Sequence, residues 1–173
     1  GSFAVGEVLR LLDGESLAAS VHAVSTVQEE VGLRGATTST YGVDPKVGIA
    51  VDVTHATDSP GMDKRIAGEC KLGAGPMICR GSNFNPVVVD MLIAAAEDEG
   101  IPYQMGGYPS GPGTDARAIQ LSRAGVATGL VSIPLRYMHT AVEVLSLEDL
   151  ANVSKLLAAF ILRVEADTDF TPQ

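Results

Sequence analysis

The chain has 173 residues, which is enough for one domain with a sizeable core. An apolar fraction of 46% with 19% charged residues excludes a disordered chain. The net charge of −9 without a basic patch argues against a nucleic-acid partner, and no apolar run reaches the ~18 residues that cross a bilayer. No secretory signal is visible. We therefore expect a globular cytoplasmic protein with neither nucleic-acid nor membrane partners.

The first half of the chain alternates helix and strand patterns. Apolar residues at helical spacing predict a helix over residues 3–12. Small and β-branched residues predict a strand over residues 17–27, and a short helix follows over residues 31–41, with Gly42 ending it. The nearly continuous apolar run at residues 47–53 is typical of a central strand that is covered on both faces.

The second half continues this alternation. Its predicted strands, the first of them irregular, cover residues 70–79, 102–105 and 125–133, the last stopped by Pro134. Its predicted helices cover residues 86–99, 114–123 and 147–165, and their start signals are Pro86, Thr114 and Ser146. The sequence therefore predicts a three-layer α/β sandwich: a mixed, mostly parallel sheet with helices on both faces.

Two adjacent carboxylates, Glu29 and Glu30, come just after the end of the strand predicted over residues 17–27. The backbone turns at a strand end, so both side chains can reach one site. Two ionised carboxylates repel each other, and their burial is costly without a counter-charge. A metal ion supplies that charge, and one glutamate can bind it while its neighbour acts as general base toward a metal-bound water.

Two further positions qualify because polar residues just past the carboxyl ends of strands usually line the site of such folds. Asp52 lies inside an apolar strand, as an ion ligand or as the partner of a buried base. His139 follows the strand that is predicted to stop at Pro134. A histidine in a loop is often structural, but beside two carboxylate strand ends a metal ligand becomes the favoured interpretation.

The remaining candidates have structural alternatives. His22 is expected on a sheet face or in the core, and Asp58 in a turn. Asp115 either compensates a helix dipole or faces substrate, and His55 has a weaker claim near Asp52. The two cysteines, Cys70 and Cys79, have no metal spacing and are expected to be reduced thiols, unless neighbouring strands bring them into a disulfide. No glycine-rich nucleotide motif is present.

Six motifs in this order resemble the glutamyl-aminopeptidase-like metallopeptidases, the family that includes the large tetrahedral (TET) aminopeptidases. Some of its members are labelled cellulases or endoglucanases. The motifs span nearly the whole chain and lie at residues 26–36, 51–54, 75–76, 101–104, 113–116 and 132–140.

The resemblance implies a metalloaminopeptidase with a zinc-peptidase-like fold, a peptide substrate and two divalent ions, zinc or cobalt. Carried over by position, Glu29 is the general base, and Glu30 and His139 bind one metal while Asp52 binds the other. The resemblance also implies homo-oligomers, from dimers up to dodecamers.

The sequence departs from the family pattern at its start. A His-x-Asp motif and a bridging aspartate are expected upstream of Gly1, together with an assembly domain, and none is found in residues 1–173. We therefore expect one α/β domain, the carboxyl-terminal portion of a catalytic domain, that binds metal weakly and hydrolyses little by itself.

Two alternatives stay open. One is a non-catalytic binding or assembly domain on the same scaffold. The other is a glycoside hydrolase that uses Glu29 and Glu30, although adjacent residues would struggle to flank a glycosidic bond with ~5 Å or more between them. Trp is absent, which also argues against a sugar site.

Overall fold

The computed structural model describes residues 1–172. Within them, one sheet has the strand order β1-β4-β2-β3, and β5 pairs with β4. Its strands are β1 (Val47–His55), β2 (Met77–Gly81), β3 (Gln104–Tyr108), β4 (Ala127–Arg136) and β5 (Val144–Leu145). The parallel pairs β1–β4 and β2–β3 hold nine and five residue pairs, whereas the antiparallel pairs β2–β4 and β4–β5 hold two each. The predicted mixed, mostly parallel sheet is thus confirmed.

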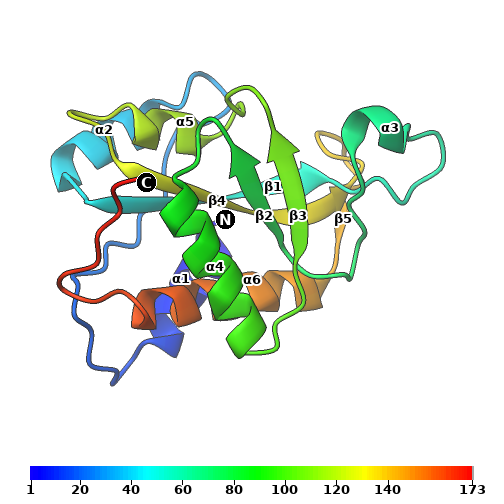
Figure 1. The fold of residues 1–173 in the computed structure, drawn as a ribbon. Helices are drawn as coiled ribbons and strands as arrows, with labels where there is room; N and C mark the ends of the chain where they lie inside the picture. Colours follow the sequence, from blue (N-terminus) through cyan, green and yellow to red (C-terminus); the bar gives the residue numbers. More distant parts are fainter. Residues whose placement is uncertain (173) are drawn as a thin grey trace.

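Helices cover both faces of this sheet. They are α1 (Ser2–Leu11), α2 (Arg34–Val43), α3 (Lys64–Ala67), α4 (Pro86–Asp98), α5 (Asp115–Gln120) and α6 (Leu147–Leu162). Figure 1 shows α2 and α5 over one face and α1, α4 and α6 over the other, with α3 in a loop that projects from the body. This arrangement confirms the three-layer α/β sandwich. Within residues 1–172, no helix is long and apolar enough to cross a membrane.

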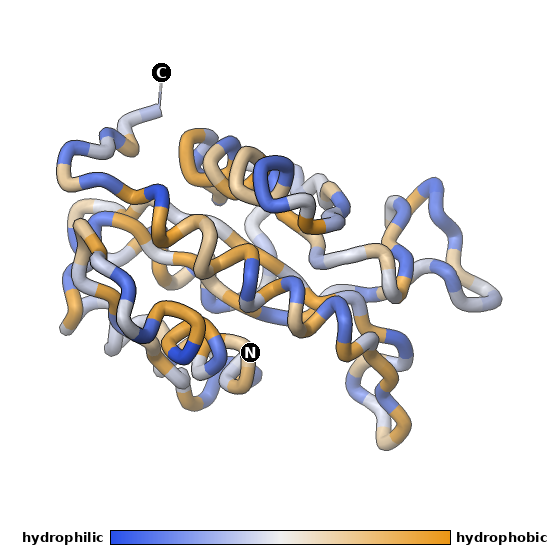
Figure 2. Tube along the Cα trace, turned by 90° about the horizontal axis from the view of Figure 1, so that it is seen from below, coloured by the Kyte–Doolittle hydropathy of each residue, from blue (hydrophilic) through white to orange (hydrophobic). Residues whose placement is uncertain are grey.

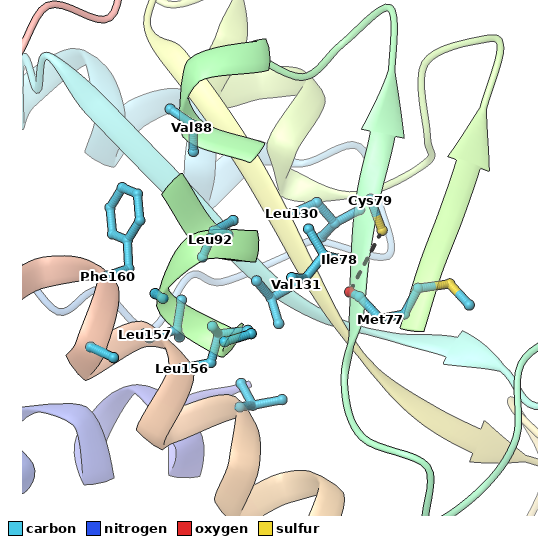
Figure 3. Packing of buried hydrophobic residues seen from close by; sticks show 14 of the residues in the cluster. Met77, Ile78, Cys79, Val88, Leu92, Leu130, Val131, Leu156, Leu157 and Phe160 are labelled. Carbon is cyan, nitrogen blue, oxygen red and sulfur yellow. Dashed lines mark hydrogen bonds between the residues drawn. The ribbon is translucent and has the colours of Figure 1, made fainter. Parts of the chain in front are cut away.

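The core lies between the sheet and the layer of α4 and α6. Figure 3 shows Leu92 of α4 pointing toward Ile78 and Leu130 of the strands, and Phe160 of α6 lies in the same buried cluster. Each of these four side chains is buried to within 2% exposure. In Figure 2, hydrophobic residues dominate the strands and these two helices, while the loop around α3 is largely hydrophilic. Because this core is closely packed, the sheet is a rigid support for the residues at its edge.

Two helix starts follow their sequence signals closely. The Asn85 side chain accepts hydrogen bonds from the amides of the first turn of α4, and Ser146 accepts one from the amide of Asp149 at the start of α6. Asp149 itself is fully buried, and its carboxylate accepts hydrogen bonds from the amides of Gly73 and Gly75 at 2.7 and 2.8 Å. The start of α6 is thereby tied to the loop before β2.

The strand predicted over residues 17–27 is wrong, because this segment makes no ladder within the described sheet. It lies across a cleft from β1, so no neighbouring strand satisfies its backbone. The prediction for His22 is wrong for the same reason: the residue is exposed in this irregular segment rather than held on a sheet face. The short helix begins later than predicted, at Arg34, and passes through Gly42 to Val43.

Proline does not stop β4, which continues through Pro134 to Arg136. The amide of Ala127 donates to Lys46, and Leu135 accepts from the amide of Ala56. Lys46 and Ala56 flank β1, so the backbone N–H and C=O groups of the odd-numbered residues of β4 point toward β1. The nitrogen of Pro134, an even-numbered residue, therefore points away from β1. The β2–β4 ladder has already ended at Ser132, so the missing N–H of Pro134 breaks no hydrogen bond.

Candidate functional site

Glu29 and Glu30 lie in a tight turn that leads into α2. The carbonyl of Glu29 accepts hydrogen bonds from the amides of Gly32 and Leu33 at 3.1 and 3.0 Å. Gln28 and Leu33, at either side of the acid pair, adopt left-handed backbone angles, with φ of 58° and 55°. Such angles are unfavourable for residues with a side chain and often mark functional sites.

The turn is fixed against α2 by the close approach of Gly35. Its amide donates to the carbonyl of Val27 at 2.9 Å. A Cβ added to Gly35 would lie less than 3.0 Å from both the backbone nitrogen and oxygen of Val27. Only glycine therefore allows α2 to begin directly against the residue that precedes the turn.

Asp52 lies on β1, opposite Ser132 of β4. Its Oδ1 accepts a hydrogen bond from the amide of Val53 at 2.8 Å, and no salt bridge reaches it within residues 1–172. Burial raises the pKa of Asp52 above its ordinary value, and the charges of Asp115 and Glu30 add to this; the Val53 hydrogen bond and the amino terminus of the chain oppose it. The alternative of a buried side-chain base beside Asp52 finds no support here.

Asp115 begins α5 and faces the acid pair. Its Oδ2 accepts a hydrogen bond from the hydroxyl of Thr26 at 2.6 Å. Its other oxygen, Oδ1, is buried and has no hydrogen-bond partner within the described residues. A buried carboxylate oxygen without a partner is costly, so it is a natural acceptor for a cation or a water. Thr26 is a site residue that sequence reasoning missed, although it opens the motif that contains Glu29 and Glu30.

His139 lies in the turn after β4 and reaches Glu30. Its Nε2 is 3.2 Å from Oε1 of Glu30, and both side chains are exposed. The backbone of His139 is left-handed, with φ of 63°, and its amide donates to Glu143 at 2.7 Å. Two residues 109 positions apart in the sequence are thus brought into contact.

Four neighbouring titratable side chains of the site act on the pKa of Glu29. Burial raises the pKa of Glu29, and the negative charges of Asp52, Glu30 and Asp115 raise it further, while His139 lowers it. Glu29 and Glu30 also line two clefts, of about 490 and about 690 Å³. The acid pair is therefore accessible from two sides, and one of its members has a carboxyl group with increased proton affinity.

The donor types of this site fit a divalent cation, whose charge would offset the repulsion among the carboxylates. The partnerless Oδ1 of Asp115 fits the same interpretation. Within residues 1–172, however, no group of three or more His, Cys, Asp or Glu side chains lies close enough to hold a metal ion. The directly assembled pair is Glu30 with His139, which is fewer than the three protein ligands that zinc uses in catalytic sites.

The other candidates have structural roles. Asp58 forms a two-pronged salt bridge with Arg136, with nitrogen–oxygen distances of 3.0 and 2.8 Å, and accepts from the amide of Leu72 at 3.1 Å. These contacts anchor the loop before α3 to the end of β4. Cys70 and Cys79 are buried free thiols, as predicted.

Comparison with known proteins bears on this site directly. The sequence profile of the family described as M42 glutamyl aminopeptidase matches residues 1–156. Lysyl aminopeptidase of Pyrococcus furiosus is 42% identical over 154 residues, which cover 89% of this chain and 43% of that protein.

Solved structures agree. An aminopeptidase of the archaeon Desulfurococcus kamchatkensis matches with a TM-score of 0.86 and 42% identity, covering 95% of this chain and 46% of the other. The TET1 peptidase of Pyrococcus horikoshii, which can assemble into a tetrahedron or a large octahedral shell, matches with a TM-score of 0.74 and 31% identity, covering 93% of this chain and 46% of the other. This chain thus spans slightly less than half the length of these relatives. It belongs to the M42 glutamyl aminopeptidase family.

Proposed function

We propose that this chain provides the general base and part of the metal-binding set of a metal-dependent aminopeptidase. The observation that carries the proposal is the contact of His139 with Glu30, next to Glu29, whose pKa is raised by burial and by its carboxylate neighbours. Membership of the aminopeptidase family supports the reaction class. The substrate would be the amino-terminal end of a peptide.

Glu30 and His139 would hold one divalent ion, zinc or cobalt, and Asp52 would hold the other. When bound, such ions polarise a carbonyl group and make water acidic enough to lose a proton near neutral pH. Glu29 would accept that proton and later deliver it to the departing amine. Its raised pKa suits both roles, because a base is most effective when its pKa lies close to the working pH.

The remaining side chains would hold this arrangement in place. The hydroxyl of Thr26 would orient Asp115, whose second carboxylate oxygen is buried without a hydrogen-bond partner within the described residues. The left-handed backbone at Gln28 and at His139 would help to orient Glu29 and the imidazole in the assembled site. Because the assembled donors are few, residues 1–173 alone would bind metal weakly and hydrolyse little, and the remainder of a longer protein would complete the site. By analogy with the relative from Pyrococcus horikoshii, the complete protein would form homo-oligomers.

A chimera tests this function. Residues 1–173 would replace the matched region of the lysyl aminopeptidase of Pyrococcus furiosus, and release of p-nitroaniline from aminoacyl-p-nitroanilides would be followed with added Zn²⁺ or Co²⁺. Loss of the general base in Glu29→Gln should lower kcat by about 10²-fold or more with metal content unchanged. His139→Ala should lower metal content as well as activity.

The matched control is Glu15→Gln, which changes an exposed glutamate in the loop after α1. It should leave both kcat and metal content unchanged. Full activity of the Glu29→Gln chimera in the presence of metal would overturn the assignment of the base. An inactive but folded and metal-loaded parent chimera would instead favour a non-catalytic domain.

A further inference from the structure

The larger of the two clefts at the acid pair, of about 690 Å³, lies between α2 and α5. Leu33, Thr37 and Tyr41 line it from the cap and body of α2, and their spacing of four residues puts them on one face of the helix. Arg117 and Leu121, also four residues apart, line it from α5 and its end. Figure 1 shows the two helices side by side on the same face of the sheet. We call this space the α2–α5 groove.

The groove has the length of a short piece of peptide. Leu33 and Tyr41 are two helical repeats apart, and a helix rises 1.5 Å per residue, so the groove extends about 12 Å along α2 from the turn of the acid pair. An extended chain covers about 3.3–3.6 Å per residue, so about three residues fit along this length. Within the described residues, neither Asp52 nor His139 lines the groove. It therefore begins at Glu29 and Glu30 and leads away from the other proposed metal ligands.

Arg117 is a cation of this groove without a carboxylate partner. Acidic residues outnumber basic ones by 21 to 12 in this chain, so partners for an arginine are plentiful. Most arginines form salt bridges with carboxylates: Arg10, Arg65, Arg80, Arg123, Arg136 and Arg163. Arg117 is exposed and forms none within residues 1–172. Its guanidinium is therefore available to a ligand in the groove.

The other arginine of the groove is already occupied. The guanidinium of Arg123 lies 3.3 Å from Asp44, donates to the carbonyl of Tyr41 at 2.8 Å, and stacks 4.1 Å from the centre of the Tyr41 ring. These contacts tie the end of α5 to the end of α2. Arg123 thus fixes the far end of the groove, and Arg117 is the cation left to recognise what lies in it.

The charges along the groove suit a peptide with an amine at one end and a carboxylate further along. The acid pair attracts an amine and repels a second carboxylate. Arg117 lines the same groove without forming a salt bridge to Glu29 or Glu30, so the two charges are separated by space that a ligand can enter. A guanidinium binds a carboxylate through two parallel hydrogen bonds, a geometry that a neutral amide cannot match.

We propose that the α2–α5 groove holds the part of a peptide that leaves after cleavage, and that Arg117 binds a carboxylate within about three residues of the cleaved bond. This inference rests on the proposed aminopeptidase function. In that function Glu29 delivers a proton to the departing amine, so the departing chain passes next to Glu29, where the groove begins. The carboxylate is either the carboxyl terminus of a short peptide or an acidic side chain. Arg117 is thus a specificity-determining residue.

The chimera with the lysyl aminopeptidase of Pyrococcus furiosus tests this preference with three peptides. They are Lys-Ala-Ala with a free carboxyl terminus, the amide of Lys-Ala-Ala, and the amide of Lys-Glu-Ala, and release of lysine is measured by chromatography. We expect kcat/KM for a carboxylate-bearing peptide to exceed that of the neutral amide by about tenfold, mainly through a lower KM. A preference for only one of the two carboxylate-bearing peptides identifies the source of the carboxylate.

Substitution of the arginine should remove this discrimination. In Arg117→Gln the ratio of kcat/KM between the carboxylate-bearing peptides and the neutral amide should fall to about one, because the charged partner is lost. Arg117→Glu should reverse the preference and favour the amide of Lys-Lys-Ala. The matched control is Arg65→Gln, since Arg65 lies in α3, outside the groove, and is 90% exposed. It should keep the preference of the parent chimera.

Binding gives a second readout that does not depend on turnover. Isothermal titration calorimetry of the Glu29→Gln chimera with the same three peptides should show a Kd about tenfold lower for a carboxylate-bearing peptide than for the neutral amide. Adding Arg117→Gln to this chimera should make the three Kd values equal. Because both readouts are ratios between peptides, a general loss of metal or of folded protein does not imitate the expected result.

Equal values for all three peptides, or a preference that survives Arg117→Gln, would overturn the proposal. A parent chimera that cleaves lysine p-nitroanilide but shows no preference refutes this inference alone, because that substrate has no residue beyond the cleaved bond. A folded and metal-loaded parent chimera that cleaves no substrate refutes the proposed function instead. The calorimetric comparison then still decides whether Arg117 binds a carboxylate.

Discussion

Replacing Gly35 by alanine should weaken the fold at the turn that carries the acid pair. The added Cβ would collide with the backbone nitrogen and oxygen of Val27, and backbone atoms cannot move aside as the end of a flexible side chain can. Overpacking of this kind costs about 1–3 kcal/mol. Alanine in a helix recovers about 0.5–1 kcal/mol relative to glycine, so we expect a net loss of about 1–2 kcal/mol.

Gly42 provides the matched control in the same helix. A Cβ added there meets nothing within 4 Å, so Gly42→Ala should stabilise the protein by about 0.5–1 kcal/mol. Because both variants share the gain in helix propensity, the difference between them isolates the collision. Urea unfolding monitored by circular dichroism at pH 7 measures both. If Gly35→Ala unfolds at the same urea concentration as Gly42→Ala, the close approach does not constrain the turn.

Three further predictions follow from burial and charge. In the metal-free protein, the stability of the fold should decrease as pH rises from the ordinary aspartate pKa through the raised pKa of Asp52. Asp52→Asn should therefore flatten this pH profile and raise stability at pH 7 by up to about 1 kcal/mol. The measurement is Tm as a function of pH. Burial raises the thiol pKa of Cys70 to about 12 and of Cys79 to about 11, so iodoacetamide at pH 8 should label neither until the protein is unfolded, as mass spectrometry would show. Arg136 lowers the pKa of Asp58, so their pair should stabilise the fold above the ordinary aspartate pKa, and Asp58→Asn should cost about 1 kcal/mol at pH 7 and less as pH falls through that lowered pKa.

For each of these predictions, a specific outcome or control would show that the reasoning is wrong. An unchanged slope in Asp52→Asn would mean that the carboxylate is solvated in the folded chain. Labelling of either cysteine under native conditions would show that the core opens locally. The control for Asp58 is Asp63→Asn, whose partner Arg65 is 90% exposed, and it should change stability by less than about 0.5 kcal/mol.

The parts of the fold that the sequence predicted well are those with local physical causes. Asn85 and Ser146 indicate the starts of α4 and α6, because a capping side chain accepts hydrogen bonds from backbone amides no more than three residues later. The buried strands β1 and β4 are visible as apolar runs. By contrast, whether residues 17–27 form a strand depends on the edge of a neighbouring strand with which they could pair, and no local sequence pattern indicates that edge.

The features of the site likewise divide into those with local causes and those that depend on tertiary packing. Its acid pair and Asp52 could be proposed because carboxylates next to apolar runs need a counter-charge, although the strand expected before the acid pair does not form and Asp52 lies within β1. The contact between His139 and Glu30 and the approach of Gly35 to Val27 depend on tertiary packing. The passage of β4 through Pro134 depends on which side of the strand still has a ladder. Such facts are properties of the assembled sheet rather than of any window of sequence.

The central claim is that the carboxylates at this rim of the sheet gather to bind divalent cations. Titration of the protein with Zn²⁺, followed by NMR of its three histidine rings, tests it most directly. We predict that the ring of His139 alone responds, with weak affinity, and that Glu30→Gln weakens the response further while His22 and His55 stay unchanged. An equal response of all three rings, or none at His139, would contradict the claim.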